Sequence, residues 1–448
     1  MPLSDFPRRG RLPLFIILLL GCIVSRAAEK PNIVFILADD MGLGDAGCYG
    51  GTIASTPNID RLAKEGTRFT QFYSASPICS PSRCGLITGQ FPARWNVTSF
   101  MQTRAGNRGC EQVDYLDPKA PALPRLLKDA GYTTAHIGKW HLGGGRDVVN
   151  PPKFAVYGYD LGLGTYESPE PAAGLGLKTT PWAKEREPQQ VARHERTRWM
   201  VDETISFLRA NAGKPCFVNL WLDDTHTPWV PEHAVERDRP NLIAVIVEMD
   251  KEIGRLMDAV PPDTLLIFAS DNGALPTFKG ERNTGLRGSK LSLYEGGIRL
   301  PFIARWPRHI PEGRVDDKTM LHAVDMMPTL AAVAGWKLPV GYNADGEDLS
   351  GALLGKSMTR GKPMFWEYGR NETFFKYPAE PDRSPNVAMR DGKWKLLVNA
   401  DGSGAELYDI LVDPRETKNV AGEEPQVAGV MKQAALDWRN GLPKVSGL

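Results

Sequence analysis

The sequence lacks an excess of charge of either sign, and it has few cysteines and histidines for its length. Its 448 residues include 54 Lys and Arg against 53 Asp and Glu, 6 Cys and 7 His. The basic residues are spread along the chain, so nothing in the charge pattern predicts a nucleic-acid partner. The composition, 42% hydrophobic and 24% charged, is that of a globular protein long enough for one large and one small domain.

The scarce cysteines exclude two common kinds of site. No pair has the C-x-x-C spacing of a zinc site, and the spread along the chain does not resemble a disulfide scaffold. One or two bridges are compatible with the sequence. Without the N-terminal Cys22 an odd number remains, so at least one thiol has another role. The five are Cys48, Cys79, Cys84, Cys110 and Cys216.

The only long apolar run lies at the N-terminus and is too short to predict a membrane span. It covers residues 12–21, follows a basic stretch, and precedes small residues at 25–28. This order is typical of an export signal, which we place at residues 1–28, and it predicts a periplasmic or secreted protein. A second reading takes Cys22 in "LLGC" as a lipid-bearing cysteine that tethers the chain to a membrane. Leu at position 20 disfavours that reading, because a smaller residue is usual there.

Strands and helices alternate along most of the chain, which predicts an α/β fold with a large, mainly parallel sheet flanked by helices. We expect strands at 33–38, 132–138, 216–222 and 264–270, and helices at 57–65, 122–131, 197–213 and 240–259. The segments 143–195 and 273–320 are predicted to be long, functional loops. After about residue 359 short strands at 363–368, 386–398 and 405–410 precede a closing helix at 423–442. The chain thus divides into a catalytic domain, 29–358, and a small C-terminal α+β subdomain with an antiparallel sheet, 359–448.

Two of the expected strands end in polar side chains that bind hard cations. Asp39 and Asp40 follow the first strand, and Asp271 and Asn272 follow the strand at 264–270. Carboxylate and amide oxygens suit Ca²⁺ or Mg²⁺ rather than zinc. Either pair alone is better explained as a cap or a turn, but two pairs at the same sheet edge favour a metal site.

Cationic and titratable side chains recur near the ends of the other segments. "GKWHLG" contains Lys139 and His141, "DDTHTPW" contains His226, and "LRGSK" contains Lys290. Each alone is better explained as a surface lysine or a packed histidine. Together they are of the kind that binds an oxyanion and transfers protons.

The segment "CSPSRCGLITG" at 79–89 resembles the signature of the sulfatase family, in the alkaline-phosphatase-like superfamily. Cys79, Pro81 and Arg83 match the signature, and Ile87 stands where Leu is usual. Seven segments resemble the family in its own order. They are "NIVFILADDMG", "TPNIDRLAKEGTRFTQFYSASPICSPSR", "AGYTTAHIGKWHLG", "SDNG", "LRGSKLSLYEGGIRLPFIARWP", "VDMMPTL" and "DGKWKLL" with "ELYDILVDPRETKNVA".

The resemblance implies a sulfuric ester hydrolase whose Cys79 is oxidised to Cα-formylglycine by a formylglycine-generating enzyme or another maturase. In the family the aldehyde hydrate attacks sulfur, a sulfated enzyme forms, and the second hydroxyl then ejects sulfate. The implied Ca²⁺ ligands are Asp39, Asp40, Asp271, Asn272 and the modified Cys79. The implied catalytic groups are Arg83 and Lys139 on the diol, His141 as base, Lys290 on a sulfate oxygen, and His226 (perhaps with Lys290) as proton donor to the leaving oxygen.

Other functions remain open at this point. A phosphonate monoester hydrolase or phosphodiesterase of the same superfamily shares the fold, and a catalytically dead protein could bind a sulfated glycan. Cys84 is interpreted as a small helix residue against the core. The substrate is expected to be a sulfated small molecule or glycan, preferably a carbohydrate sulfate. The expected pocket walls are Trp95, Arg146, Tyr166, Trp182, Trp229 and Tyr368.

Overall fold

A computed structural model describes residues 30–166, 191–231 and 238–443 of the chain. The predicted export signal, Cys22 and Trp182 lie outside these ranges. Within them, no helix combines the length and the apolar character that crossing a bilayer requires.

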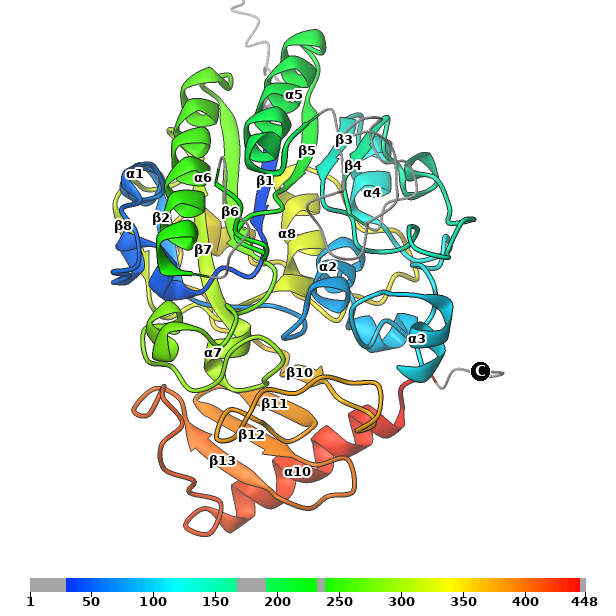
Figure 1. Cartoon of the computed structure of the whole chain (residues 1–448), viewed down its shortest axis with the longest axis vertical. Helices are drawn as coiled ribbons and strands as arrows, with labels where there is room; N and C mark the ends of the chain where they lie inside the picture. The colour runs from blue at the N-terminus through cyan, green and yellow to red at the C-terminus, as the bar shows by residue number, and fades with distance from the viewer. Residues whose placement is uncertain (1–29, 167–190, 232–237, 444–448) are drawn as a thin grey trace, which may run out of the picture.

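The larger part of the chain is built around a nine-stranded sheet (Figure 1). Its order is β4-β3-β5-β1-β6-β7-β2-β8, with β9 beside β2. All neighbours pair in parallel except β7, which runs antiparallel to β6 and β2. The strands are β1 (Asn32–Ala38), β2 (Thr67–Tyr73), β3 (Thr133–Gly138), β4 (Leu161–Gly164), β5 (Cys216–Trp221), β6 (Thr264–Ser270), β7 (Arg299–Arg305), β8 (Arg314–Asp316) and β9 (Leu321–His322).

The four predicted strands are β1, β3, β5 and β6, and they lie side by side in the sheet. The prediction of one long loop over 273–320 is wrong, because β7 and β8 lie within it. Pro301 inside β7 and the glycines just before the strand obscured its periodicity. The segment 143–195 likewise contains β4.

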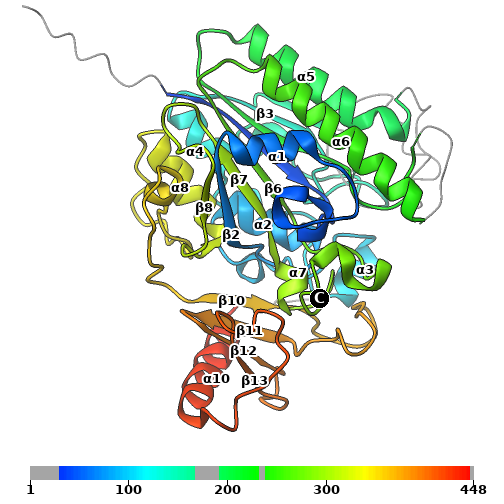
Figure 2. The same ribbon diagram turned by 90° about the vertical axis from the view of Figure 1, so that its left-hand side faces the viewer.

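Helices cover both faces of the sheet, as Figure 2 shows from the side. They are α1 (Pro57–Lys64), α2 (Cys79–Thr88), α3 (Arg104–Gly109), α4 (Leu123–Asp129), α5 (Arg196–Ala210), α6 (Arg239–Ala259), α7 (Glu295–Ile298), α8 (Met326–Val333) and α9 (Ser350–Leu353). Alternate residues of β1 point to opposite faces of the sheet and pack in different cores. Val34 and Ile36 join the core under α1, α5 and α6, whereas Phe35 and Leu37 join the core under α2, α4 and α8. Burial on both faces explains the unbroken apolar run of this strand.

The C-terminal part forms a four-stranded antiparallel sheet and one helix. Its elements are β10 (Met364–Glu367), β11 (Val387–Asp391), β12 (Trp394–Val398), β13 (Glu406–Asp409) and α10 (Pro425–Asn440). One face packs against α10, through Leu396 and Met431 among others. The other face shares a core with Tyr73, Ile78 and Cys79 of the larger part. The predicted fold class is confirmed, and the small sheet lies directly beneath the signature segment.

Candidate active site

The parallel strands bring the predicted site residues to one edge of the sheet. β3, β5, β1 and β6 are neighbours in the sheet, and each is followed by charged, amide or imidazole side chains. These are Lys139 and His141 after β3, His226 after β5, Asp39 and Asp40 after β1, and Asp271 and Asn272 after β6. The carboxyl edge of a parallel sheet is where ligands bind in such folds.

Helix α2 supplies the signature residues from the other side. Cys79 is its first residue and is 2% exposed, and Arg83, one turn further, is fully buried. Cys84 packs in the core on the same helix, as predicted. Gly85 allows α2 to approach β2 closely, because a Cβ there would lie 2.3 Å from the side chain of Ala75. All five cysteines of the described chain are free.

Cations alternate with carboxylates across the site. Arg83 donates to one oxygen of Asp271 through Nε at 3.0 Å and Nη2 at 2.7 Å, and through Nη1 to the carbonyl of Lys139 at 2.8 Å. The ammonium of Lys139 pairs with Asp39. Lys290, which follows no strand, lies 2.6 Å from Asp40. The structure thus brings all the predicted cations to the predicted metal ligands.

The cations keep the first two carboxylates ionised despite burial. Burial, the largest single influence, would raise the pKa of Asp39 and of Asp40, but the surrounding positive groups together outweigh it and hold both pKa values below the usual range, with Lys139 the strongest of them for Asp39 and Lys290 for Asp40. Asp40 adopts a left-handed conformation, with φ at 60°, which lets consecutive aspartates face the same site. Arg282 holds this turn by donating to the carbonyl of Asp40 at 3.0 Å.

Two oxygens at the site fit a bound hard cation. Oδ1 of Asp39 and Oδ1 of Asn272 are buried without a hydrogen-bond partner. The two residues follow the neighbouring strands β1 and β6. Burial and the adjacent Asp39 raise the pKa of Asp271 to about 7, so these carboxylates need further positive charge to stay ionised together. Asp39, Asp40 and His226 are also close enough together to hold a metal. Since Ca²⁺ takes oxygen ligands, the four oxygen-bearing residues fit it better than a set with imidazole.

The two histidines are held by backbone carbonyls, which fixes their tautomers. Nε2 of His141 lies 3.1 Å from the carbonyl of Met101 and must donate to it, so Nδ1, which has no partner, carries the lone pair. Nδ1 of His226 donates to the carbonyl of Thr227 at 2.6 Å, and Nε2 points to Asp40 at 3.7 Å. Burial and Lys139 lower the pKa of both rings, that of His226 to about 4.

A small cavity adjoins these groups and includes residues that the sequence analysis did not single out. Its lining is Asp39, Lys139, Tyr166, Arg193, Arg196, Asp223, His226 and Thr227. The ring of Tyr166 lies 4.5 Å from that of His141 and 5.4 Å from the ammonium of Lys139. Asp223 follows a buried strand as Asp39 and Asp271 do, so the same strand-end signal could have found it.

The predicted pocket walls are correct only in part. Arg146 donates to the hydroxyl of Tyr166, so both lie at the site. The prediction for Trp229 is wrong, because its side chain is fully buried and its ring packs on that of Phe278, with 5.8 Å between the ring centroids. Tyr368 is also buried in the core beneath the signature segment. Trp95 is partly buried and packs against the core that includes Cys84 of α2.

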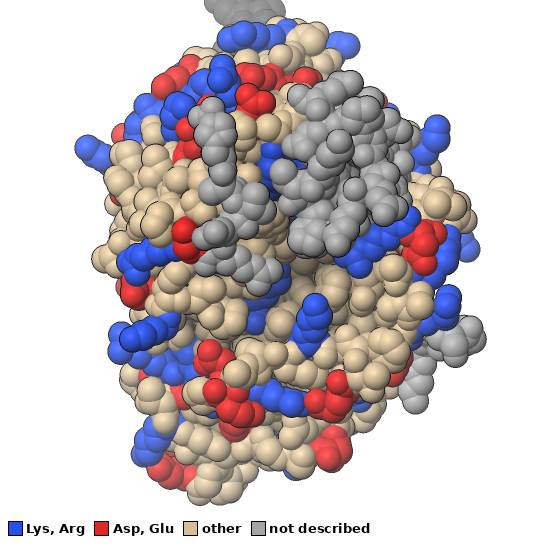
Figure 3. Space-filling model, viewed as in Figure 1, with Lys and Arg blue, Asp and Glu red and all other residues tan. Residues whose placement is uncertain are grey.

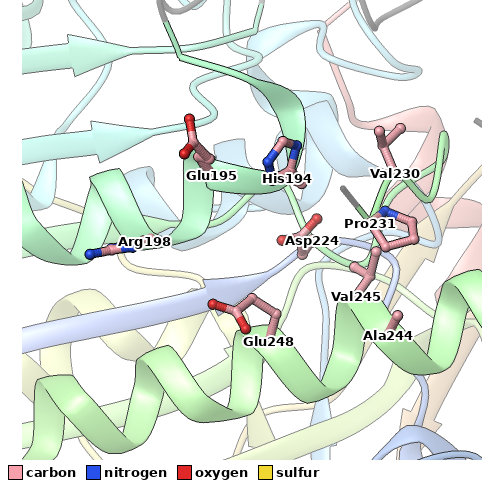
Figure 4. Close-up of a pocket in the computed structure, with 9 residues that line it drawn as sticks. All are labelled: His194, Glu195, Arg198, Asp224, Val230, Pro231, Ala244, Val245 and Glu248. Carbon is pink, nitrogen blue, oxygen red and sulfur yellow. The ribbon is translucent and has the colours of Figure 1, made fainter. Parts of the chain in front are cut away.

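A larger cavity lies behind the site and contains none of the predicted catalytic residues (Figure 4). Its lining is His194, Glu195, Arg198, Asp224, Val230, Pro231, Ala244, Val245 and Glu248. Asp224 stands between it and the site, with its carboxylate bound to Arg193 and Thr197. Figure 3 shows a hollow on the face of the molecule where β1, β6 and α2 approach one another in Figure 1, with Lys and Arg side chains along it. Positive charge around a hollow favours anionic ligands.

Comparisons with known proteins agree with this geometry. The sulfatase family model matches residues 31–336, and the C-terminal model of N-sulphoglucosamine sulphohydrolase matches 288–439. N-acetylgalactosamine-6-O-sulfatase of Bacteroides thetaiotaomicron is 30% identical over 89% of this chain and 91% of its own. Human arylsulfatase A is 31% identical over 91% and 88%. The crystal structure of Ps i-CgsB in complex with k-i-k-neocarrahexaose is similar with a TM-score of 0.76 and 26% identity, over 93% of this chain and 94% of that one.

Proposed function

This chain belongs to the sulfatase family of sulfuric ester hydrolases, and we propose that it cleaves a sulfate monoester on a carbohydrate. One observation carries the mechanism: a buried cysteine at a helix N-terminus faces three cations and an oxygen-rich cluster at the edge of the sheet. The names of the galactosamine sulfatase and of the carrahexaose complex support a sugar substrate.

The proposed nucleophile derives from Cys79. Oxidised to formylglycine and hydrated, it would supply a hydroxyl that attacks sulfur, and Ca²⁺ held by Asp39, Asp40, Asp271 and Asn272 would supply positive charge beside it. As a thiol, Cys79 is poorly suited to attack, because burial raises its pKa.

The cations of the chain bind and stabilise the sulfuryl group. Lys139 pairs with Asp39 and Lys290 pairs with Asp40, so both ammonium groups are fixed at the site. Arg83 is fixed by Asp271 and orients the backbone of Lys139. Charge that builds on the sulfuryl oxygens in the transition state therefore meets groups already in place.

The two histidines are the proposed proton-transfer groups, one as base and one as acid. Nδ1 of His141 carries a lone pair, which suits the base that ejects sulfate. His226 lines the cavity with Nδ1 held by the carbonyl of Thr227, and its Nε2 is the proposed proton donor to the leaving sugar oxygen. The negative charge of a bound sulfate ester beside this ring favours its protonated form.

The test of the activity uses protein co-expressed with a formylglycine-generating enzyme. Sulfated oligosaccharides, an aryl sulfate and an aryl phosphonate are assayed in parallel, and a mass shift in the peptide containing Cys79 reports its conversion. We expect sulfate release from a sugar, none from Cys79→Ala, and near wild-type rates from Cys84→Ala on the same helix. Turnover of the phosphonate alone, or by Cys79→Ala, would overturn the proposal.

The calcium part has its own test. Chelation followed by desalting is expected to lower the sulfatase rate at least tenfold and to lower the melting temperature, since a ligand that binds only the native state stabilises it. Added Ca²⁺ should restore both, and the Asp40→Asn variant should show a smaller melting shift with Ca²⁺. Restoration by Zn²⁺ but not by Ca²⁺ would contradict the assignment.

We also propose that the protein is exported to the periplasm or secreted. The support is the basic, apolar and small-residue order of residues 1–28. N-terminal sequencing of protein recovered from its host should place the mature end near Ala27 or Ala28. A lipid on Cys22 would instead establish the membrane-tethered alternative.

A further inference from the structure

We propose that Arg193 is a positioning residue that holds the proton donor His226 at the leaving-group side of the site. The inference rests on the proposed function, because it assigns a new part to the proton transfer from His226. Arg193 is 3% exposed, lies just before α5, and lines the same small cavity as His226.

The guanidinium of Arg193 binds both ends of the turn that carries His226. Nη2 donates to the carbonyl of Asp223 at 3.0 Å and to that of His226 at 3.4 Å. Nη1 lies 2.7 Å from the carboxylate of Asp224. One rigid planar group therefore binds the first, second and last residues of a four-residue turn, which a lysine ammonium cannot do with the same geometry.

The opposite side of this turn is bound to the metal-ligand strand. The amide of Asp39 donates to the carbonyl of Asp224 at 2.9 Å, and the amide of Thr225 donates to the carbonyl of Asp39 at 2.7 Å. These bonds fix the middle of the turn to β1. The amide of His226 donates to the carbonyl of Asp223 at 3.1 Å, and Arg193 is the side chain that ties the carbonyl of His226 back to the turn.

The placement matters because proton transfer is sensitive to distance. A displacement of the donor of about 1 Å can cost ~100-fold in rate. Loss of Arg193 leaves the imidazole and the sulfuryl-binding cations intact but removes the side chain that holds the carbonyls of Asp223 and His226 together, which loosens the position of the donor. The effect should therefore fall on substrates whose leaving group needs a proton.

The test compares a sulfated sugar with 4-nitrophenyl sulfate in Arg193→Gln and Arg193→Lys. A sugar alkoxide needs protonation as it leaves, whereas a nitrophenolate needs little. We expect kcat/KM on the sugar sulfate to fall about 10- to 100-fold in both variants, and on the nitrophenyl ester less than about 3-fold. His226→Gln should show the same selectivity with a larger loss, and adding Arg193→Gln to His226→Gln should cost nothing more on the sugar.

A matched control separates positioning from stability. Arg360 forms an equally buried pair with Asp325, far along the chain, so Arg360→Gln should lose stability without a change in leaving-group selectivity. If Arg193→Gln does not fold, Asp224→Asn, which weakens the same clamp, provides the same comparison. Equal losses on both esters, or additivity with His226→Gln, would overturn the inference. If wild-type protein cleaves neither ester, it is the proposed function that fails.

Discussion

The carboxylates at the strand ends and the carboxylates beneath the small sheet are equally buried, but their oxygens are partnered differently. In the first group, Oδ1 of Asp39 has no partner. In the second, which we call the interface cluster, Lys395 of β12 lies 2.9 Å from both Glu295 and Glu416. The two remaining oxygens there accept from the hydroxyl of Tyr73 and the amide of Glu295, each at 2.7 Å.

This difference separates a structural use of buried charge from a functional one. In the interface cluster, Oε1 of Glu416 makes no hydrogen bond but lies 2.9 Å from the ammonium of Lys395, so the charges are paired within the chain and can join the small sheet to α7 without a ligand. In the strand-end cluster, Oδ1 of Asp39 has neither a hydrogen bond nor an ion pair of this kind, which leaves it available to the proposed Ca²⁺. Buried oxygens without a hydrogen-bond partner also occur elsewhere in the described residues, as at Asn96, so the support for a binding site comes from their combination with paired cations at the strand ends.

The largest expected effect on stability comes from breaking the ion pairs of the interface cluster. Lys395→Met removes the ion pair of the buried Glu416, whereas Glu295 keeps Arg299 at 3.4 Å, and we expect the change to lower the free energy of unfolding by about 3–5 kcal/mol in urea titrations. The control is Lys393→Met, which removes a half-exposed partner of Asp409 and should cost about 0–1 kcal/mol. Equal losses in the two variants would show that the interface cluster adds no stability.

The matching change at the strand ends should affect rate more than stability. Lys139→Met is expected to lower kcat/KM about 10²- to 10³-fold, because it removes a cation from the sulfuryl group. Its unfolding free energy should change by less than about 1–2 kcal/mol, since Asp39 keeps Arg83 at 3.7 Å and would keep the proposed Ca²⁺. A large stability loss with an unchanged rate would abolish the contrast between the clusters.

The interface cluster should also impose a pH dependence on stability. Burial raises the pKa of Glu416 from 4.5 to about 7, although Lys395 opposes the shift. Between these values the native state holds a proton that the unfolded state has lost, so stability falls as pH rises, by at most about 1.4 kcal/mol per pH unit. Glu416→Gln should flatten the melting temperature between pH 5 and pH 8. A wild-type melting temperature that rises over this range would contradict the assignment.

The strand-end cluster could be predicted from the sequence to a degree that the interface cluster could not. Asp39, Asp40, Asp271 and Asn272 each follow a buried apolar run, and the parallel-sheet rule then places them together. Glu295 and Lys395, by contrast, are 100 residues apart on elements with no shared pattern, and only the packing of the small sheet joins them.

The same reasoning explains what the sequence analysis missed at the site. Arg193 was not singled out because it lies just before α5, where a basic residue is ordinarily exposed to solvent. Trp229 is predicted to line the pocket because it is an aromatic residue in the loop after the strand at 216–222, but it packs into the core, where it donates to the carbonyl of Thr225 at 2.9 Å. The order of strands along the sequence predicted which strand ends meet, but the packing of the folded chain determines which side chains face the cavity.

The smallest expected effect belongs to a buried residue outside both clusters. Cys84 is fully buried on the helix that carries Cys79, but its neighbours are apolar and burial raises the pKa of its thiol, so it stays neutral and unreactive. Cys84→Ala removes one sulfur atom from the core and should cost about 1 kcal/mol in urea unfolding, with kcat/KM within about twofold of wild type. A loss of activity comparable to that of Lys139→Met would mean that α2 transmits core packing to Cys79. In that case the activity of the strand-end cluster would depend on the packing of uncharged side chains around α2 as much as on its charged groups.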